Sequence, residues 1–253
     1  MDNRASKPDP KTRSAARAMP SGVKDGGSRS ENSPLALDEA VYQAGVKPMT
    51  RRVKSGETLF IAGEEFRCIY PIRRGFFKTN LVDGEGREQV TGFFMMREIL
   101  GMDGLSSGFY GVSATALEDS EVFAIPYSVI EEAGRQNSSV RQSLHAALSS
   151  EIVRNHSVMM LLGSMNARER LAAFLLNLSK RLMHGGYSRS QFVLRMRREE
   201  IGSYLGLKLE TVSRTFSALC EEGLIEVNKK QICIVDINAL ERIFKSGNPG
   251  DSR

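Results

Sequence analysis

The stretch REEIGSYLGLKLETVSRTFSALC, residues 198–220, decides the fold of this chain. Its apolar residues recur at three- and four-residue steps, which predicts one helix from Arg198 to Leu205 and a second from Leu209 to Glu222. Gly206 supplies a tight turn between the helices, and Gly223 stops the second one. We therefore interpret the segment as a helix-turn-helix.

The two predicted helices are expected to share one small core. Gly202 has no side chain and so allows the two backbones to cross closely. The side chains expected between the helices are Ile201, Leu205, Leu207, Val212, Phe216 and Leu219. The alternative is an ordinary hairpin of two amphipathic helices, which is a common arrangement without a DNA-binding role.

The flanking residues favour the helix-turn-helix. A strand-like run over Gln191–Met196 precedes the segment, and the short apolar runs Leu224–Val227 and Ile232–Val235 follow it. The polar turn Asn228–Gln231 separates these last two runs, which predicts a β-hairpin wing whose two lysines can reach a DNA backbone. The unit is thus predicted to be a winged helix-turn-helix.

In such a unit the first turns of the second helix enter the major groove. Here they present Glu210, Ser213 and Arg214 to base edges. Arg214 can donate two hydrogen bonds to guanine, Glu210 can accept one from cytosine, and Ser213 can contact a base or a thymine methyl group. Thr211 and Lys208 are better placed for phosphates, which position a protein without reading the sequence. Because an acidic residue repels DNA unless it reads a base, Glu210 indicates sequence specificity.

Upstream of this unit, residues 50–126 predict an antiparallel β-roll or sandwich. Short apolar runs alternate with glycines, as is typical of antiparallel strands joined by tight turns. The expected strands are Thr58–Ile61, Cys68–Ile72, Phe76–Val82, Gln89–Phe94, Val112–Leu117 and Glu121–Ile125. Helical patterns follow Pro126, so the predicted fold class is α+β.

Residues 138–164 predict one long amphipathic helix. Its apolar stripe consists of Leu144, Leu148, Ile152, Met159 and Leu162, with Asn155 interrupting it. Two interpretations of the stripe stay open: packing on the same domain, or a dimerisation seam in which Asn155 helps to set the register. A further helix is expected from Ser164 to Arg181, where Asn166 and Glu169 form a capping-box pattern.

Composition narrows the classes of function. The chain has 253 residues, 41% of them hydrophobic, and a formal net charge of +5. Basic residues are concentrated in the C-terminal third, which suits nucleic-acid binding. We find no apolar run that could cross a membrane and no signal peptide, and so expect a cytoplasmic protein with no membrane partner. Cys68, Cys220 and Cys233 are scattered, so neither a disulfide framework nor a metal site is expected.

An enzyme is not expected. The sequence has no glycine-rich phosphate loop followed by lysine, no nucleophile elbow and no metal-binding helix with paired histidine and glutamate. The remaining alternative is an effector-binding module that happens to carry a helix pair and has no specific DNA readout.

These motifs resemble the FNR branch of the CRP/FNR transcription regulators. The resemblance is carried by Glu169–Phe174, Ile201–Leu207, Glu210–Arg214, Gly56–Phe60 and Gln89–Phe93. It implies a roll similar to cyclic-nucleotide-binding domains, a dimerisation helix at 138–164, and a homodimer on a palindrome of TTGAT half-sites. It also implies that the loop Asp83–Gly86 touches RNA polymerase, for which the alternative is a solvated hairpin tip.

Two departures from the family bear on what the roll senses. Oxygen-sensing members hold an iron–sulfur cluster on several cysteines, whereas residues 1–67 contain no cysteine and Phe123 stands where the roll ligand is expected. Cyclic-nucleotide binders carry an arginine for the phosphate, whereas residues 101–114 contain none and Asp103 would repel a phosphate. We therefore expect neither an iron–sulfur cluster nor cyclic AMP.

A haem stays open, because relatives that respond to nitric oxide also lack the cysteines. His145, His156 and His184 all lie outside the roll, and we expect them to be structural or solvated. We also expect Cys68 to be a small core residue rather than a redox sensor. The regulator is thus either constitutive or gated by a ligand that the sequence does not declare.

The predicted organisation combines these patterns. It consists of a disordered basic tail (1–34), a sensor β-roll (35–137), a dimerisation helix (138–164), a winged helix-turn-helix (165–245) and a disordered tail (246–253). The link Gly163–Met165 is the expected hinge between the long helix and the DNA-binding part.

Overall fold

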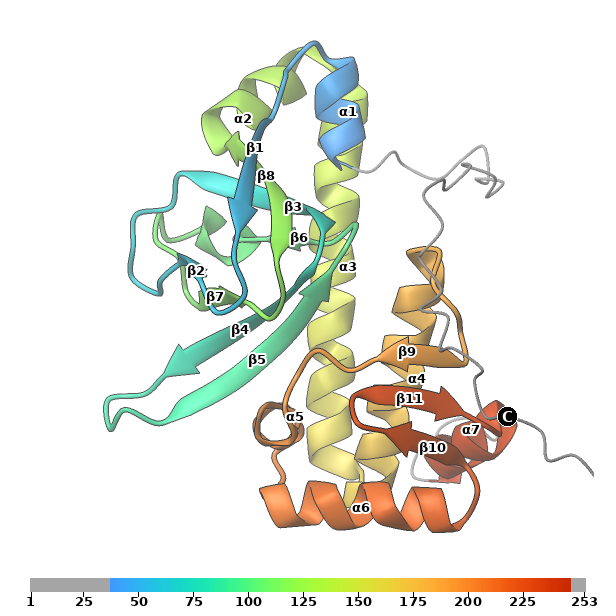
Figure 1. Ribbon diagram of the computed structural model, residues 1–253. Helices are drawn as coiled ribbons and strands as arrows, with labels where there is room; N and C mark the ends of the chain where they lie inside the picture. The colour runs from blue at the N-terminus through green and yellow to red at the C-terminus, as the bar shows by residue number, and fades with distance from the viewer. Residues whose placement is uncertain (1–36, 247–253) are drawn as a thin grey trace, which may run out of the picture. The chain divides into compact units, whose positions relative to one another are not determined.

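Eight short antiparallel strands build the N-terminal part of the fold, in a computed structural model that describes residues 37–246 (Figure 1). One sheet has the order β1 (Met49–Val53), β8 (Ser120–Pro126), β3 (Cys68–Arg74) and β6 (Ile99–Leu100). The other has the order β2 (Thr58–Phe60), β7 (Ser113–Ala116), β4 (Phe76–Val82) and β5 (Glu88–Met95). The strands bury a shared apolar cluster that includes Phe77, Leu100 and Val122. This confirms the predicted antiparallel sheet domain.

Six of these strands lie where the sequence predicts strands, whereas β1 and β6 are not predicted. β1 reads MTRRV, and only Val53 in it is buried. Its pairing with β8, from Met49 opposite Ala124 to Val53 opposite Ser120, supplies the hydrogen-bond partners. β6 has two residues and pairs with β3. Both strands form only by pairing with a strand that is distant in the sequence. Their own apolar patterns are too short to predict a strand.

Helices precede, interrupt and follow the strands of the roll. They are α1 (Leu37–Gln43), the 3-10 helix η1 (Met102–Leu105), α2 (Tyr127–Gln136) and α3 (Ser138–Ser164). α3 is the predicted long helix, and Asn137 begins it by accepting a hydrogen bond from the backbone N–H of Ser139 at 2.9 Å. Both α1 and α2 pack against α3, and this contact buries Ile130 and Val140. The N-terminal half of α3 is therefore part of the roll's own core.

The C-terminal part is a winged helix-turn-helix, as predicted. Its elements are α4 (Ala167–His184), β9 (Gln191–Val193), α5 (Arg198–Leu205), α6 (Leu209–Glu221), β10 (Ile225–Asn228), β11 (Gln231–Ile234) and α7 (Ile237–Ser246). The three strands form one antiparallel sheet in the order β10-β11-β9. The predicted capping box at the start of α4 is present, with the Asn166 side chain accepting from the backbone N–H of Glu169 at 3.1 Å.

Helix α7 is the element of this part that the prediction missed. Asp236 precedes it, and its carboxylate accepts a hydrogen bond from the backbone N–H of Ala239 at 2.9 Å. Leu240 is fully buried where α7 packs against α4. An aspartate followed by apolar residues at helical spacing is a recognisable helix start, so the signal was present in the sequence.

The approach at Gly202 is as close as the sequence predicts, and the backbone nearest to this glycine belongs to the turn between α5 and α6. The backbone N–H of Leu207 donates to the carbonyl of Gly202 at 2.8 Å. A Cβ atom on Gly202 would lie 2.6 Å from the carbonyl oxygen of Leu207. Of the predicted core, Leu207 is half-buried and the others are buried: Ile201, Leu205, Val212, Phe216 and Leu219.

This core does not stop at the helix-turn-helix. It continues into the second sheet of the roll, where Val90, Phe93 and Met95 of β5 belong to the same buried cluster as α4 and α5. The predicted tail 1–34 and residues 247–253 lie outside the described residues. Within the part of the chain that the structure describes, no helix is long and apolar enough to cross a membrane.

Replacing Gly202 with alanine is expected to destabilise the protein. The new Cβ would meet a backbone oxygen at 2.6 Å, and a backbone atom cannot rotate away. We expect the free energy of unfolding in urea to fall by about 1 to 3 kcal/mol, the usual cost of overpacking a core. Gly84→Ala is the control, because the Cβ there meets nothing within 4 Å. An equal effect of the two substitutions would contradict the close crossing.

Candidate nucleic-acid interface

Helix α6 separates a buried face from an exposed one. Val212, Phe216 and Leu219 face the core, at the three- and four-residue spacing of an α-helix. Glu210 and Arg214, four residues apart, share the opposite and exposed face. The same burial pattern that anchors the helix therefore presents its N-terminal turns to solvent.

The predicted DNA-reading residues are brought together on this exposed face. Glu210, Ser213 and Arg214 are all exposed, and their side chains have no hydrogen bond or ion pair with another described residue. Lys208 is exposed just before α6 begins, and Thr211 is half-buried in its first turn. A guanidinium with free donors and a carboxylate with free acceptor atoms are the groups that base edges require.

Two arginines that sequence analysis did not single out support α6. The guanidinium of Arg198 lies over the ring of Phe216, with its central carbon 3.2 Å from the ring centroid. Burial lowers the pKa of this arginine. At the other end of α6, Arg168 forms an ion pair with Glu222. The second pair joins residues 54 positions apart, so no local sequence signal could have found it.

The wing lies next to α6 in the chain and carries its lysines at the tip. β10 and β11 pair antiparallel, from Ile225 opposite Ile234 to Asn228 opposite Gln231. Lys229 and Lys230 between these strands are both exposed, and Lys229 has a left-handed backbone with φ of 56°. The predicted hairpin is confirmed, and its two ammonium groups are accessible.

The stripe predicted on α3 divides into two halves. Leu144 and Leu148 are half-buried and pack against the roll's own core. Ile152, Asn155, Met159 and Leu162 are exposed. Val153 and Met160, which were not predicted, are also exposed apolar residues on this helix. The packing interpretation thus fits the first half of the stripe, and an unpaired apolar surface forms the second half.

The roll contacts the helix-turn-helix directly through β4 and β5. The hydroxyl of Ser203 in α5 accepts from the backbone N–H of Val90 at 2.8 Å. Lys78 lies between two carboxylates, 2.8 Å from Glu88 and 3.2 Å from Glu200. Burial disfavours the charge on Lys78, but the hydrogen bonds to these carboxylates outweigh it and raise the pKa of Lys78. Residues of the predicted sensor domain therefore hold the first helix of the DNA-binding unit.

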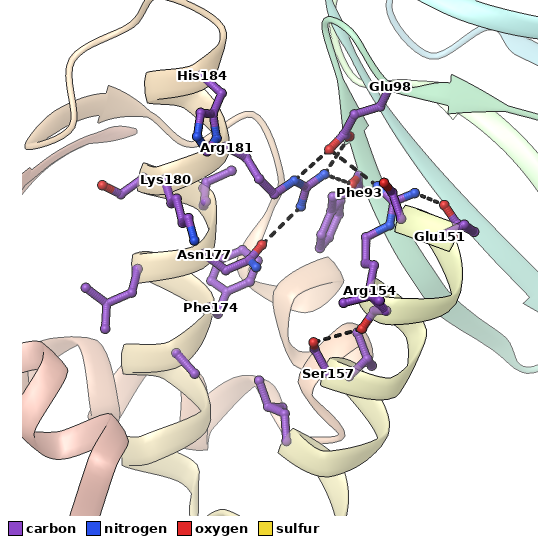
Figure 2. Close-up of a pocket in the computed structure, with 18 of the residues that line it drawn as sticks. Phe93, Glu98, Glu151, Arg154, Ser157, Phe174, Asn177, Lys180, Arg181 and His184 are labelled. Carbon is purple, nitrogen blue, oxygen red and sulfur yellow. Dashed lines mark hydrogen bonds and ion pairs between the residues drawn. The ribbon is translucent and has the colours of Figure 1, made fainter. Parts of the chain in front are cut away.

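A second junction surrounds Glu98, just before β6, and Figure 2 shows its charged side chains converging. Arg181 of α4 donates to the two carboxylate oxygens of Glu98 at 2.8 and 2.7 Å. Arg154 of α3 lies 3.4 Å from the same carboxylate and is also paired with Glu151. Burial lowers the pKa of Arg154, and the carboxylate of Glu98 opposes this shift. One side chain thus joins the roll, the long helix and the DNA-binding unit.

Aromatic rings fill the space beside this charged junction. Phe93 of β5 lies 6.1 Å from Phe174 of α4 and 5.1 Å from Tyr204 of α5, measured between ring centroids. Burial raises the pKa of the Tyr204 phenol. A cavity of about 1120 Å³ opens between α3 and α4, and these rings and the Glu98 junction line it. The junction is therefore partly accessible from solvent.

An exposed polar face on a helix with a buried back, a lysine-tipped wing and a β-roll that packs on α5 define the class of winged-helix DNA-binding proteins that carry a second, β-roll domain. Comparison with protein families agrees. Residues 169–243 match the Crp-like helix-turn-helix domain, and residues 50–137 match the cyclic nucleotide-binding domain.

Individual relatives give the same answer. The chain is 45% identical to the transcriptional regulatory protein Btr of Bordetella pertussis over 193 residues, covering 76% of this chain and 80% of the relative. It is 38% identical to the fumarate and nitrate reduction regulatory protein of Escherichia coli, covering 76% of each. The solved structure of FixK2 from Bradyrhizobium japonicum matches 78% of this chain and 98% of its own, with 28% identity and a TM-score of 0.71. The chain belongs to the CRP/FNR family of transcription regulators.

Replacing Glu98 with glutamine is expected to weaken the junction between the roll and the DNA-binding unit. The amide keeps the size of the side chain but removes the charge that two arginines share. We expect the free energy of unfolding in urea to fall by about 1 to 2 kcal/mol, because charged hydrogen bonds at a partly exposed site are lost. The control Glu85→Gln lies on an exposed turn and should change stability by less than about 0.5 kcal/mol. Equal effects would show that Glu98 contributes no more than a surface charge.

Proposed function

We propose that this protein regulates transcription as a homodimer that binds a palindrome of TTGAT half-sites. The proposal is carried by three exposed side chains of α6, those of Glu210, Ser213 and Arg214, which have no partner among the described residues. The opposite side of this helix is buried in the core. Side chains held on a rigid helix and left without internal partners suit the reading of base edges. The TTGAT sequence of the proposed half-sites is inferred from the resemblance of these three residues to those of the FNR branch.

Each residue of the reading face has a distinct proposed role. Arg214 donates two hydrogen bonds to a guanine, Glu210 accepts from a cytosine amino group, and Ser213 contacts a base or a thymine methyl. Lys208 and Thr211 contact phosphates at the start of α6. Replacing the guanines of the half-sites should therefore remove the contacts of Arg214 and leave the phosphate contacts of Lys208 in place.

The homodimer is proposed to form along α3. Ile152, Met159 and Leu162 present apolar surface on one side of the helix, with Asn155 among them. A second copy of the same helix can cover this surface, and a buried asparagine then favours one register. Pairing along α3 would place two α6 helices for two successive turns of the major groove.

We propose that the roll works without an iron–sulfur cluster or cyclic AMP. The three cysteines lie in separate elements, Cys68 in β3, Cys220 in α6 and Cys233 in β11. The carboxylate of Asp103 accepts hydrogen bonds from the backbone N–H groups of Gly111 and Val112 at 2.6 and 3.1 Å. The Asp103 carboxylate thus occupies two backbone N–H donors that the phosphate of a cyclic nucleotide would otherwise need.

RNA polymerase is the proposed protein partner, through the loop Asp83–Gly86. This loop has an ordered shape, because the Asp83 carboxylate accepts from the backbone N–H groups of Glu85 and Arg87 at 2.9 and 3.0 Å. The side chain of Arg87 lowers the pKa of Asp83. A role in activation agrees with the related Anr protein of Pseudomonas aeruginosa, which is named a transcriptional activator. The site of action is the cytoplasm, where bacterial DNA lies.

Arg214→Ala is expected to remove sequence selectivity while leaving the fold intact. We would measure binding of purified protein, at one fixed salt concentration, to the TTGAT palindrome and to a duplex with its guanines changed. Each bidentate contact to guanine contributes about 1 to 3 kcal/mol of discrimination. With two copies per dimer, the preference for the palindrome should fall by about a hundredfold or more.

The control for this experiment is Arg135→Ala, which removes an exposed arginine on α2. It should keep the preference for the palindrome, since α2 is remote from α6 in the chain and packs against α3 and β8. If Arg214→Ala still selects the palindrome, the reading face is assigned to the wrong residues. If the native protein itself shows no preference, the proposed function fails.

Met159→Asp is expected to produce monomers. A charge in the centre of an apolar helix seam must lose its hydration, which the pairing energy cannot offset. Sedimentation velocity should show a dimer for the native protein and a monomer for the variant. Met49→Asp is a matched control, because the two methionines are exposed to 69% and 70% and Met49 lies in β1. A dimeric Met159→Asp variant would contradict pairing along α3.

A further inference from the structure

One guanidinium joins three backbone segments where the long helix meets the DNA-binding unit. Arg170, in the first turn of α4, donates from Nε to the carbonyl of Met165 at 2.8 Å. Its two terminal nitrogens donate to the carbonyls of Leu205 and Leu162, both at 2.9 Å. All three acceptors are main-chain oxygens, so the contact depends on backbone positions and not on flexible side chains.

Two of these acceptors lie at the C-terminal ends of helices. Leu162 is in the last turn of α3, and Leu205 is the final residue of α5. Carbonyl groups in the last turn have no partner within their helix and carry the negative end of its dipole. A cation is the preferred partner at such an end. Arg170 thus caps two helices at once, and its planar fork holds them in a defined relative position.

The contact leads directly to the recognition helix. Gly206 ends α5 in the left-handed conformation, with φ of 63°. A Cβ atom on Gly206 would lie 3.3 Å from the Arg170 guanidinium and 3.5 Å from the side chain of Leu162. α6 begins at Leu209, three residues later. Arg170 therefore contacts both the C-terminal end of α3, the proposed dimer helix, and the turn that precedes α6, the proposed reading helix.

We propose that Arg170 is a positioning residue that fixes the direction of α6 relative to α3 and so sets the spacing between half-sites that the dimer accepts. The proposal rests on the homodimer proposed above. The link 163–165, expected from sequence to be a hinge, is short, and Arg170 bonds to Leu162 on one side of it and to Met165 within it. A joint held in this way transmits the geometry of the dimer to each reading helix.

The physical consequence is a strict demand on DNA spacing. One inserted base pair moves a half-site by about a tenth of a helical turn and rotates it by the same fraction. A dimer with fixed α6 helices cannot follow both half-sites after this change. A dimer with loosely attached α6 helices can still bind both half-sites, and it therefore discriminates less between the two spacings.

The test compares native protein and Arg170→Lys on two duplexes, the TTGAT palindrome and the same palindrome with one central base pair inserted. Lysine keeps the charge but cannot form the three-way fork. We expect the ratio of the two affinities to fall by about tenfold, equivalent to about 1.4 kcal/mol. Binding to a duplex with a single half-site should stay unchanged, because the reading face itself is intact. Arg135→Lys, the same substitution at an exposed arginine on α2, is the control and should keep the native ratio.

Each outcome separates the two proposals. If native protein prefers the uninterrupted palindrome and folded Arg170→Lys keeps the same preference, the positioning role is overturned. If native protein does not select the palindrome over a duplex with altered guanines, the proposed DNA site is wrong, whatever Arg170 does. If Arg170→Lys loses single half-site binding and unfolds at lower urea, its role is general stability and the positioning proposal is again overturned.

Discussion

The close crossing of α5 and α6 is the contact on which the remaining structure depends. At Gly202 the turn that leads into α6 comes so close to α5 that the carbonyl of Leu207 occupies the space of a side chain. Packing against α4 and α5 buries Val212, Phe216 and Leu219 on one side of α6 and therefore determines which residues lie on its other side. The exposed position of Arg214 is a consequence of packing on the opposite face, because a helix repeats every 3.6 residues.

A second set of contacts decides how this unit is held. Glu98 links three parts of the chain through arginines of α3 and α4, and Lys78 links the roll to α5 through Glu200. Partly buried ion pairs contribute little net stability compared with apolar packing, but they require one geometry. Their effect here is to define the relative placement of the roll, the long helix and the DNA-binding unit.

Much of the fold could be predicted because its signals are local. The glycine at position 206, the spacing of apolar residues in α6 and the Asn166 capping box each involve neighbours within four residues. The same holds for the reading face, since its residues follow directly from the buried pattern. Strands β1 and β6 could not be predicted, because each exists only through pairing with a distant strand. Helix α7 had a local signal that the prediction did not use.

The sequence by itself determined six strands of the roll, the long helix α3, the winged helix-turn-helix and the residues that α6 presents, since periodic burial and turn chemistry are written in consecutive residues. Only the tertiary structure decided the contacts that orient α6. Arg170 meets Leu205 across 35 positions, Arg181 meets Glu98 across 83, and Ser203 meets Val90 across 113. Such contacts depend on the apolar packing that holds segments far apart in the sequence side by side, which no local pattern of residues records.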